Sequence, residues 1–181
     1  MARKLRKTVV LVGMMGAGKT AVGTQLARLL GAPFLDSDEE IEKAANMKVA
    51  EIFARDGEPF FRARESEVLL RLLGGRPCVL STGGGAYLSP ANRAAISEQG
   101  LAVWLRADLD LLWQRVRHKT TRPLLRTANP RATLAELLAG REPAYSKADL
   151  IVDARPEYTV EAMARQVLAA LETRPDVLET R

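Results

Sequence analysis

The eight residues from Gly13 to Thr20 have the pattern G-x-x-x-x-G-K-T, which belongs to one kind of local structure, a phosphate-binding loop. The β-branched run TVVLV (residues 8–12) precedes the pattern and is typical of a buried strand. Apolar residues at helical spacing follow it as far as Leu30, and Gly31 is a helix stop signal. The sequence therefore predicts a strand, a glycine loop and a helix, in the order that phosphate binding requires.

Each residue type in this loop has a role in binding a polyphosphate such as ATP. Gly13, Gly16 and Gly18 allow a tight turn in which successive backbone amides point toward an anion. Lys19 brings a positive charge to the β- and γ-phosphates, and the Thr20 hydroxyl is placed to ligate Mg²⁺. The alternative is a glycine-rich turn that binds nothing, and the flanking strand and helix argue against it.

Length and composition indicate a single soluble domain over residues 1–181, with 47% hydrophobic and 27% charged residues. The one cysteine, Cys78, excludes an internal disulfide framework and fits a reducing compartment. No apolar run approaches the length that spans a membrane. We therefore expect a cytoplasmic protein with no membrane partner, and we expect it to be a monomer.

The formal net charge of +5 permits two interpretations, a nucleic-acid surface or a site that handles several anions. Basic residues cluster at positions 115–126, without interleaved aromatic residues. We favour the site for several anions, and we expect no nucleic-acid partner.

Four further apolar runs alternate with helical patterns and predict strands at residues 33–36, 78–81, 101–105 and 150–152. Alternating strands and helices predict a parallel sheet with helices on both faces. Ligands of such sheets bind at the carboxyl ends of the strands, where the glycine loop also lies. Residues 173–181 are expected to fray at the end of the chain.

Two acidic residues, Asp36 and Asp38, follow the second predicted strand and admit two interpretations. Ser37 with Glu40 three residues later forms a capping box, and acids are stabilising at a helix start. Beside a phosphate loop that carries Mg²⁺, two carboxylates also suit phosphoryl transfer. The reaction needs one carboxylate near the metal and another that holds or deprotonates the accepting hydroxyl group. We favour the catalytic interpretation.

Arg62 and Glu65 lie three residues apart on a predicted helix, which by itself indicates a surface ion pair. Three consecutive glycines, Gly83 to Gly85, directly follow the third predicted strand. Such a run is costly in backbone entropy, so the close approach of backbone to a ligand explains it better than a plain turn.

The ordered motifs GMMGAGKT, LDSD, FFRARE, STGGGA, TRPLL and REPAY resemble those of the shikimate kinase family, over residues 8 to about 171. The resemblance implies a three-layer α/β fold of the P-loop kinase type. Its five-stranded parallel sheet would have the strand order 2-3-1-4-5. It also implies that the γ-phosphate of ATP moves to the 3-hydroxyl of shikimate, with Mg²⁺ as the cofactor.

The resemblance also implies roles for residues on the acceptor side. Asp38 would bind the shikimate hydroxyls and act as base or orienter, while Asp36 and Thr20 would serve Mg²⁺. Arg62, in a substrate-binding helical region at about residues 37–74, and Arg141 would hold the shikimate carboxylate. Backbone contacts to the acceptor would come from Gly83, Gly84 and Gly85.

On the nucleotide side, the resemblance implies that Arg122 belongs to a mobile lid at about residues 117–130 and stabilises the transferring phosphoryl group. Arg115 would lie beside the nucleotide, and Lys19, Asp38 and Arg122 would form the catalytic set. The expected nucleotide-binding residues are Gly16, Ala17, Gly18, Lys19, Thr20, Ala21, Arg115 and Arg122. Near the adenine, the sequence suggests only the neighbourhood of Arg155 and Pro156, and no adenine contact is assigned.

Two other functions compete with this one. A gluconate kinase of the same architecture is disfavoured by the two-arginine clamp together with the D-S-D and G-G-G motifs. A GTP-dependent switch is suggested only by Ser146-Lys147-Ala148-Asp149, which partly resembles a guanine-reading N/T-K-x-D element. That element precedes its predicted strand, and the chain has no D-x-x-G motif, so we expect ATP and not GTP.

Overall fold

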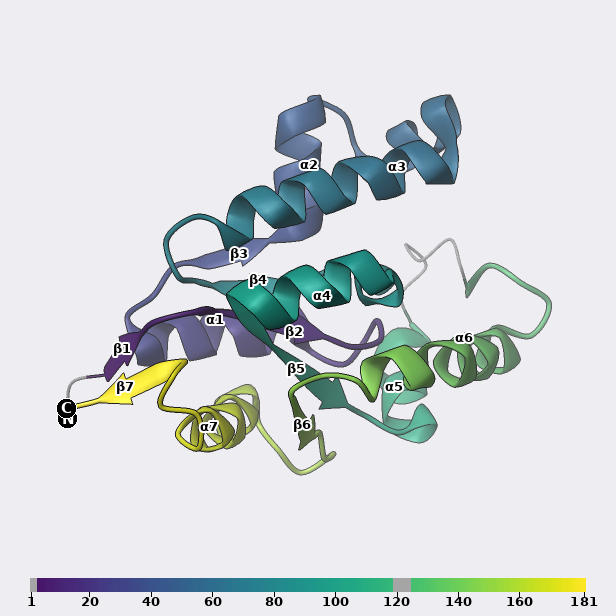
Figure 1. Cartoon of the computed structure of the whole chain (residues 1–181). Helices are drawn as coiled ribbons and strands as arrows, with labels where there is room; N and C mark the ends of the chain where they lie inside the picture. The colour runs from purple at the N-terminus through teal and green to yellow at the C-terminus, as the bar shows by residue number, and fades with distance from the viewer. Residues whose placement is uncertain (1–2, 119–124) are drawn as a thin grey trace.

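The computed structural model describes residues 3–118 and 125–181. Within these residues, a sheet of five parallel strands forms the centre of the molecule (Figure 1). The strands are β2 (Thr8–Val12), β3 (Phe34–Asp36), β4 (Val79–Ser81), β5 (Gly100–Arg106) and β6 (Leu150–Asp153). Their order is β3-β4-β2-β5-β6, which confirms the predicted 2-3-1-4-5. Every residue of the central strand β2 is buried, as its β-branched composition predicts.

Helices cover both faces of the sheet, with α4 in front of it and α1 behind it in Figure 1. Several begin at a side chain that accepts a backbone N–H, as Ser89, Asp108 and Thr159 do. The helical elements are α1 (Lys19–Leu30), α2 (Ser37–Ala45), α3 (Val49–Leu73), η1 (Ala86–Leu88), α4 (Pro90–Gln99), α5 (Leu109–Val116), α6 (Pro130–Tyr145) and α7 (Val160–Leu171). None of these helices is both long and apolar enough to cross a membrane.

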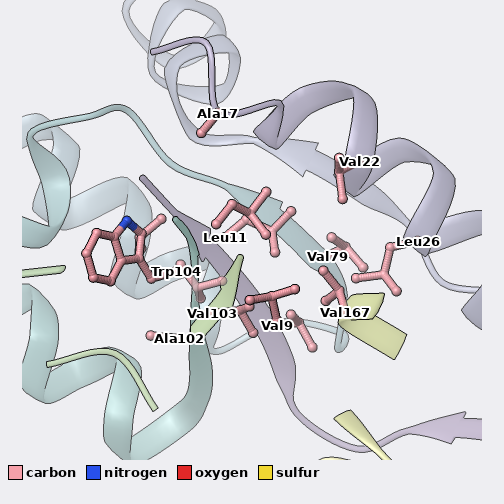
Figure 2. Packing of buried hydrophobic residues seen from close by; sticks show 14 of the residues in the cluster. Val9, Leu11, Ala17, Val22, Leu26, Val79, Ala102, Val103, Trp104 and Val167 are labelled. Atoms are coloured by element: carbon pink, nitrogen blue, oxygen red, sulfur yellow. The ribbon is translucent and has the colours of Figure 1, made fainter. Parts of the chain in front are cut away.

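The main hydrophobic core lies between the sheet and these helices (Figure 2). Val9 and Leu11 of β2 belong to the same buried cluster as Val79 of β4, Leu26 of α1 and Val167 of α7. Burial of large apolar side chains such as these stabilises the fold by about 1.5–3 kcal/mol each. The core therefore fixes the strands whose carboxyl ends carry the polar loops.

Helices α2 and α3 have a smaller core of their own, and they project away from the sheet in Figure 1. Ile41 and Ile52 pack there with Phe61 and Val68. Helix α3 is broken at Gly57, whose φ of 84° and ψ of 171° are not helical. The break turns the first part of α3 relative to the second, and a residue with a side chain would be strained at that φ.

The expectation that residues 173–181 fray is wrong. Strand β7 (Leu178–Thr180) pairs antiparallel with β1 (Arg3–Leu5), so the two ends of the chain lie side by side (Figure 1). Val177 is 0% exposed and packs in the main core with Leu5. The pairing satisfies backbone groups of both ends, and the buried apolar side chains hold them in place.

Candidate functional site

A cavity of about 750 Å³ opens at the carboxyl ends of the parallel strands. It brings together residues from the glycine loop, the start of α2, the second part of α3, the loop after β4, α5 and α6. The predicted residues that line it are Gly16, Ala17, Gly18, Lys19, Thr20, Ala21, Asp36, Asp38, Arg62, Gly83, Gly84, Gly85, Arg115 and Arg141. Arg122 is the one predicted site residue that lies outside the described residues.

The glycine loop has the backbone that its sequence predicts. Gly16 and Gly18 have φ values of 85° and 95°, in the left-handed region that favours glycine. Gly18 is the residue before α1, which begins at Lys19, so the first unpaired amides of that helix face the cavity side. A β-carbon at Gly16 would lie 2.8 Å from Cγ1 of Val116 on α5, so this position also lacks room for one.

Two cations lie at this loop. The Lys19 ammonium group donates to the carbonyl oxygens of Gly13 (2.6 Å) and Met14 (3.0 Å). The Arg115 guanidinium of α5 donates to the Gly16 carbonyl at 2.9 Å, and burial lowers the pKa of this arginine. Both positive charges are therefore held at the anion-binding turn by the loop's own carbonyl groups.

The D-S-D segment shows why its capping interpretation needs correction. Asp36, and not Ser37, caps α2, because its Oδ1 accepts the N–H groups of Asp38 and Glu39 at 2.9 and 3.2 Å. The Ser37 hydroxyl instead accepts the N–H of Gly83 at 3.3 Å. The predicted capping box of Ser37 with Glu40 is therefore wrong, since Ser37 lies inside the helix and ties it to the glycine run.

Asp38 does not cap the helix, and its half-buried carboxylate lines the cavity. Its Oδ1 is buried without a hydrogen-bond partner among the described residues, and a β-carbon at Gly83 would lie 2.9 Å from it. Burial, with the nearby charges of Asp36 and Glu65, raises the pKa of Asp38 to about 6, while Lys19 opposes the rise. A carboxylate with an unpaired oxygen and a raised pKa is suited to accept a proton from a ligand.

Arg62 and Glu65 pair on α3, with 2.8 Å between Nη1 and Oε1. The interpretation of this pair as a surface ion pair is wrong, because Glu65 is only 1% exposed. Burial raises the pKa of Glu65 and the hydrogen bond from Arg62 opposes the rise. The pair holds the Arg62 guanidinium at Gly85, where a β-carbon would collide with Nη2 of that arginine.

Arg141 approaches the same glycine run from α6. A β-carbon at Gly84 would lie 2.5 Å from its Nη1, and the same nitrogen lies 4.0 Å from the Met14 sulfur. Glycines 83 to 85 therefore admit one carboxylate and two guanidinium groups, each from a different helix or helix start. The backbone entropy that glycine costs is offset by this close approach of charged groups to the chain.

At the other end of the cavity, the sequence suggested only the neighbourhood of Arg155 and Pro156 and assigned no contact. Ala154, Arg155, Tyr158, Thr159, Val160 and Met163, after β6 and at the start of α7, also line the cavity. The available signal was their position, since the loop after the fifth predicted strand must meet the glycine loop at the same edge of the sheet. Apolar and aromatic groups beside a phosphate loop suit the base of a nucleotide.

Asp149, in the element that partly resembles a guanine-reading motif, lies away from this edge. It directly precedes β6, and its Oδ2 accepts the N–H of Ala102 at 2.8 Å, near the start of β5. These are the amino ends of the strands, opposite the cavity. The carboxylate therefore has a structural partner, and this removes the main support for a GTP-dependent switch.

Comparisons with known proteins agree with the geometry. A family model described as shikimate kinase matches residues 15–172. A shikimate kinase of Cereibacter sphaeroides is 70% identical to this chain, and the match covers 98% of this chain and 88% of the relative. A shikimate kinase of Ruegeria pomeroyi is 67% identical, and the match covers 98% of this chain and 91% of the relative. The solved structure of a shikimate kinase from Acinetobacter baumannii in complex with shikimate has a TM-score of 0.86 and 39% identity, covering 92% of this chain and 93% of that one. The chain belongs to the shikimate kinase family.

Proposed function

We propose that this protein transfers the γ-phosphate of ATP to the 3-hydroxyl of shikimate, forming ADP and shikimate 3-phosphate. The observation that carries the proposal is one cavity lined by a phosphate-binding loop, by the Asp38 carboxylate and by the guanidinium groups of Arg62 and Arg141. The loop suits the polyphosphate, and the two arginines suit a small carboxylate. The shikimate bound to the relative from Acinetobacter baumannii is an acceptor of this chemistry.

Arg62 and Arg141 act as the clamp for the acceptor carboxylate. Their guanidinium groups lie at Gly85 and Gly84, on neighbouring positions of one loop. Both groups can therefore bind the same small ligand. Planar guanidinium groups bind carboxylates through paired hydrogen bonds, which fixes the orientation of the ligand as well as its affinity. The ring hydroxyls of the acceptor are thereby turned toward Asp38.

Asp38 prepares the accepting hydroxyl group. Its unpaired Oδ1 accepts the hydrogen bond of that hydroxyl and takes the proton as the oxygen attacks the γ-phosphorus. The bond from the γ-phosphorus to the bridging oxygen of ADP breaks in the same step, and Lys19 stabilises the charge that develops on the phosphates. Arg122 adds a second cation from the proposed lid at residues 117–130.

The donor groups near the loop fit Mg²⁺, which supplies charge neutralisation at the β- and γ-phosphates. Mg²⁺ usually keeps several waters and takes only one or two protein oxygens besides the phosphates. Thr20 offers a hydroxyl beside Lys19, and both it and Asp36 line the cavity. Asp36 uses Oδ1 to cap α2, so its Oδ2 would be the oxygen that assists Mg²⁺, through water.

We also propose that residues 1–181 act as one kinase domain, with residues 37–74 as its acceptor-binding region. The separate small core of α2 and α3 supports this division. All residues of the proposed mechanism come from one chain, so we propose that the protein works as a monomer. A small-molecule pathway enzyme of this kind is proposed to act in the cytoplasm, with neither nucleic acid nor membrane as a partner.

Release of ADP with shikimate, gluconate, quinate or no acceptor tests the function directly. We expect Mg²⁺-dependent release with shikimate, at least about a hundredfold faster than without an acceptor, because the acceptor supplies the attacking oxygen. GTP in place of ATP tests the guanine-reading alternative. Preference for gluconate, or release that ignores the acceptor, would refute the proposal.

Replacing Arg62 with lysine is expected to weaken acceptor binding by roughly 1.5–3 kcal/mol, or about ten- to a hundredfold in KM. Lysine keeps the positive charge but lacks the planar fork. Binding of ATP without acceptor is expected to change little. Arg64→Lys is the matched control, since Arg64 forms a more exposed pair with Glu67 at the same i,i+3 spacing on α3. An unchanged KM for shikimate in Arg62→Lys would contradict the clamp.

Replacing Gly85 with alanine is expected to raise the KM for shikimate at least about tenfold, because the new methyl group takes the place of the Arg62 guanidinium. The backbone tolerates the change, since Gly85 has a φ of −95° and a ψ of −10°. Gly140→Ala on α6 is the control, because a β-carbon there meets nothing within 4 Å. We expect Gly140→Ala to keep wild-type kinetics, and equal effects of the two changes would refute the close-approach argument.

A further inference from the structure

Two tyrosines, Tyr87 and Tyr145, are buried, and each donates its hydroxyl to a backbone carbonyl. Tyr145 is the last residue of α6, is 0% exposed, and donates to the carbonyl of Gly84 at 2.5 Å. Tyr87 donates to the carbonyl of Lys147 at 3.3 Å, in the turn between α6 and β6. The two hydroxyls are chemically alike, but only that of Tyr145 holds the glycine run of the cavity.

Gly84 is contacted twice by the same helix. Arg141 lies four residues before Tyr145, one turn earlier on the same face of α6. A β-carbon at Gly84 would lie 2.5 Å from the Arg141 Nη1 and 3.8 Å from the Tyr145 hydroxyl. The distance between α6 and the glycine run therefore sets where the Arg141 guanidinium stands relative to the acceptor, and the Tyr145 hydrogen bond spans that distance.

The ring of Tyr145 is itself fixed from the other side. It packs against the indole of Trp104 on β5, with 5.7 Å between the ring centroids and a tilt of 41°. Burial raises the pKa of Tyr145, with Arg141 opposing, so the hydroxyl is protonated and able to donate at neutral pH. A buried ring that packs against the sheet and donates through a protonated hydroxyl is a rigid spacer between the sheet, α6 and the glycine run.

We propose that Tyr145 is a positioning residue for the acceptor carboxylate. Its hydrogen bond to the Gly84 carbonyl holds the glycine run against α6, so that Arg141 and the neighbouring backbone stand in place before the acceptor binds. Because affinity depends on such preorganisation, loss of the bond costs acceptor binding and not nucleotide binding. This inference rests on the proposed function, since the acceptor carboxylate is the group that Arg141 is proposed to bind.

The test compares Tyr145→Phe with Tyr87→Phe in the full-length protein. Each change removes one buried hydroxyl and keeps the ring, and Phe at 145 keeps the packing against Trp104, so both variants are expected to fold. For Tyr145→Phe we expect the KM for shikimate to rise about five- to thirtyfold, kcat to stay within about threefold, and the Kd for ATP to stay unchanged. For Tyr87→Phe we expect all three constants to stay near those of wild type.

A shikimate analogue with a neutral amide in place of the carboxylate separates positioning from a merely structural role. Wild type is expected to discriminate strongly against the amide, and Tyr145→Phe is expected to discriminate less, because the lost contact serves the carboxylate. Combining Tyr145→Phe with Arg141→Lys is expected to cost less than the sum of the two single changes, since Tyr145 acts through Arg141.

The outcomes distinguish the inference from the proposed function beneath it. If wild type phosphorylates shikimate and rejects the amide while Tyr145→Phe behaves identically, the positioning role is refuted and the function stands. Equal losses in Tyr145→Phe and Tyr87→Phe also refute it, because general damage to the core then explains the effect. If wild type itself fails to use shikimate, the proposed function falls and the inference falls with it.

Discussion

Replacing Asp38 with asparagine is expected to reduce kcat by about 10²–10⁴-fold, while ATP binding persists. Asparagine has nearly the same shape but cannot take the proton of the accepting hydroxyl group. Glu39→Gln is the matched control, because it removes the same charge one residue away at an exposed position of α2. Steady-state kinetics and ATP titration measure both variants, and a fully active Asp38→Asn would remove Asp38 from the mechanism.

The same substitution is expected to stabilise the protein at neutral pH. The pKa of Asp38 is raised from 3.8 to about 6 in the folded protein, chiefly by burial. The folded state therefore holds a proton that the unfolded state releases between these values, so stability falls as the pH rises from about 4 to 6. Above pH 6 the full penalty of a buried carboxylate is present, and it corresponds to roughly 1–3 kcal/mol.

Thermal unfolding of the two proteins at several pH values checks this expectation. At pH 8, Asp38→Asn is expected to melt several degrees above wild type, at roughly 2–4 °C per kcal/mol for a domain of this size. At pH 4 the two melting temperatures are expected to converge, because wild-type Asp38 is then protonated in the folded state. If Asp38→Asn raises the melting temperature equally at both pH values, the raised pKa of Asp38 is contradicted. Activity with shikimate should rise with pH through about 6 for the same group.

Replacing Lys19 with alanine is expected to lower kcat at least about a hundredfold, because it would remove the cation proposed to stabilise the charge on the β- and γ-phosphates. The fold is expected to persist, since Lys19 is the half-buried first residue of α1 and its ammonium group donates to loop carbonyls, outside the hydrophobic core. Circular dichroism and thermal unfolding check the fold, and ADP release with saturating shikimate checks the rate.

Lys43→Ala provides the control for Lys19→Ala. Lys43 lies on α2 with 72% of its side chain exposed, and its ammonium group lies 3.5 Å from Oε1 of Glu40. We expect its loss to leave kcat unchanged, because an exposed ion pair contributes at most about 1 kcal/mol to stability and does not touch the phosphates. Near-normal turnover in a folded Lys19→Ala protein would refute the assignment of the phosphate loop.

Much of the fold could be predicted because its signals are local. The β-branched run at residues 8–12 and the glycines before Lys19 determine a strand and an anion-binding turn within about a dozen neighbours. The paired ends of the chain could not be predicted in this way. Val177 packs with Leu5 across the whole length of the sequence, and such contacts leave no periodic pattern in either segment.

The candidate site also has features that could be predicted from the sequence and features that could not. Asp38 and the glycine run were identified from residue type and order, and Arg62 from the resemblance to the shikimate kinase family. The structure brings all of them to one cavity. The identity of the helix cap at Asp36 and the burial of Glu65 were not readable from the sequence. The burial of Glu65 depends on which face of α3 packs against the rest of the protein, which is a property of packing between segments. The cap is local, but Asp36, Ser37 and Asp38 are all suitable capping residues in a row.

The sequence by itself determined the phosphate loop, the alternation of strands and helices, and the residue types that face an anion, because each follows from neighbours along the chain. Only the tertiary structure decided that Oδ1 of Asp38 is buried without a hydrogen-bond partner among the described residues, and that Tyr145 holds Gly84. These facts arise where α2, α3 and α6 meet one loop. The close packing of distant segments sets their distances, and residue order along the chain does not contain those distances.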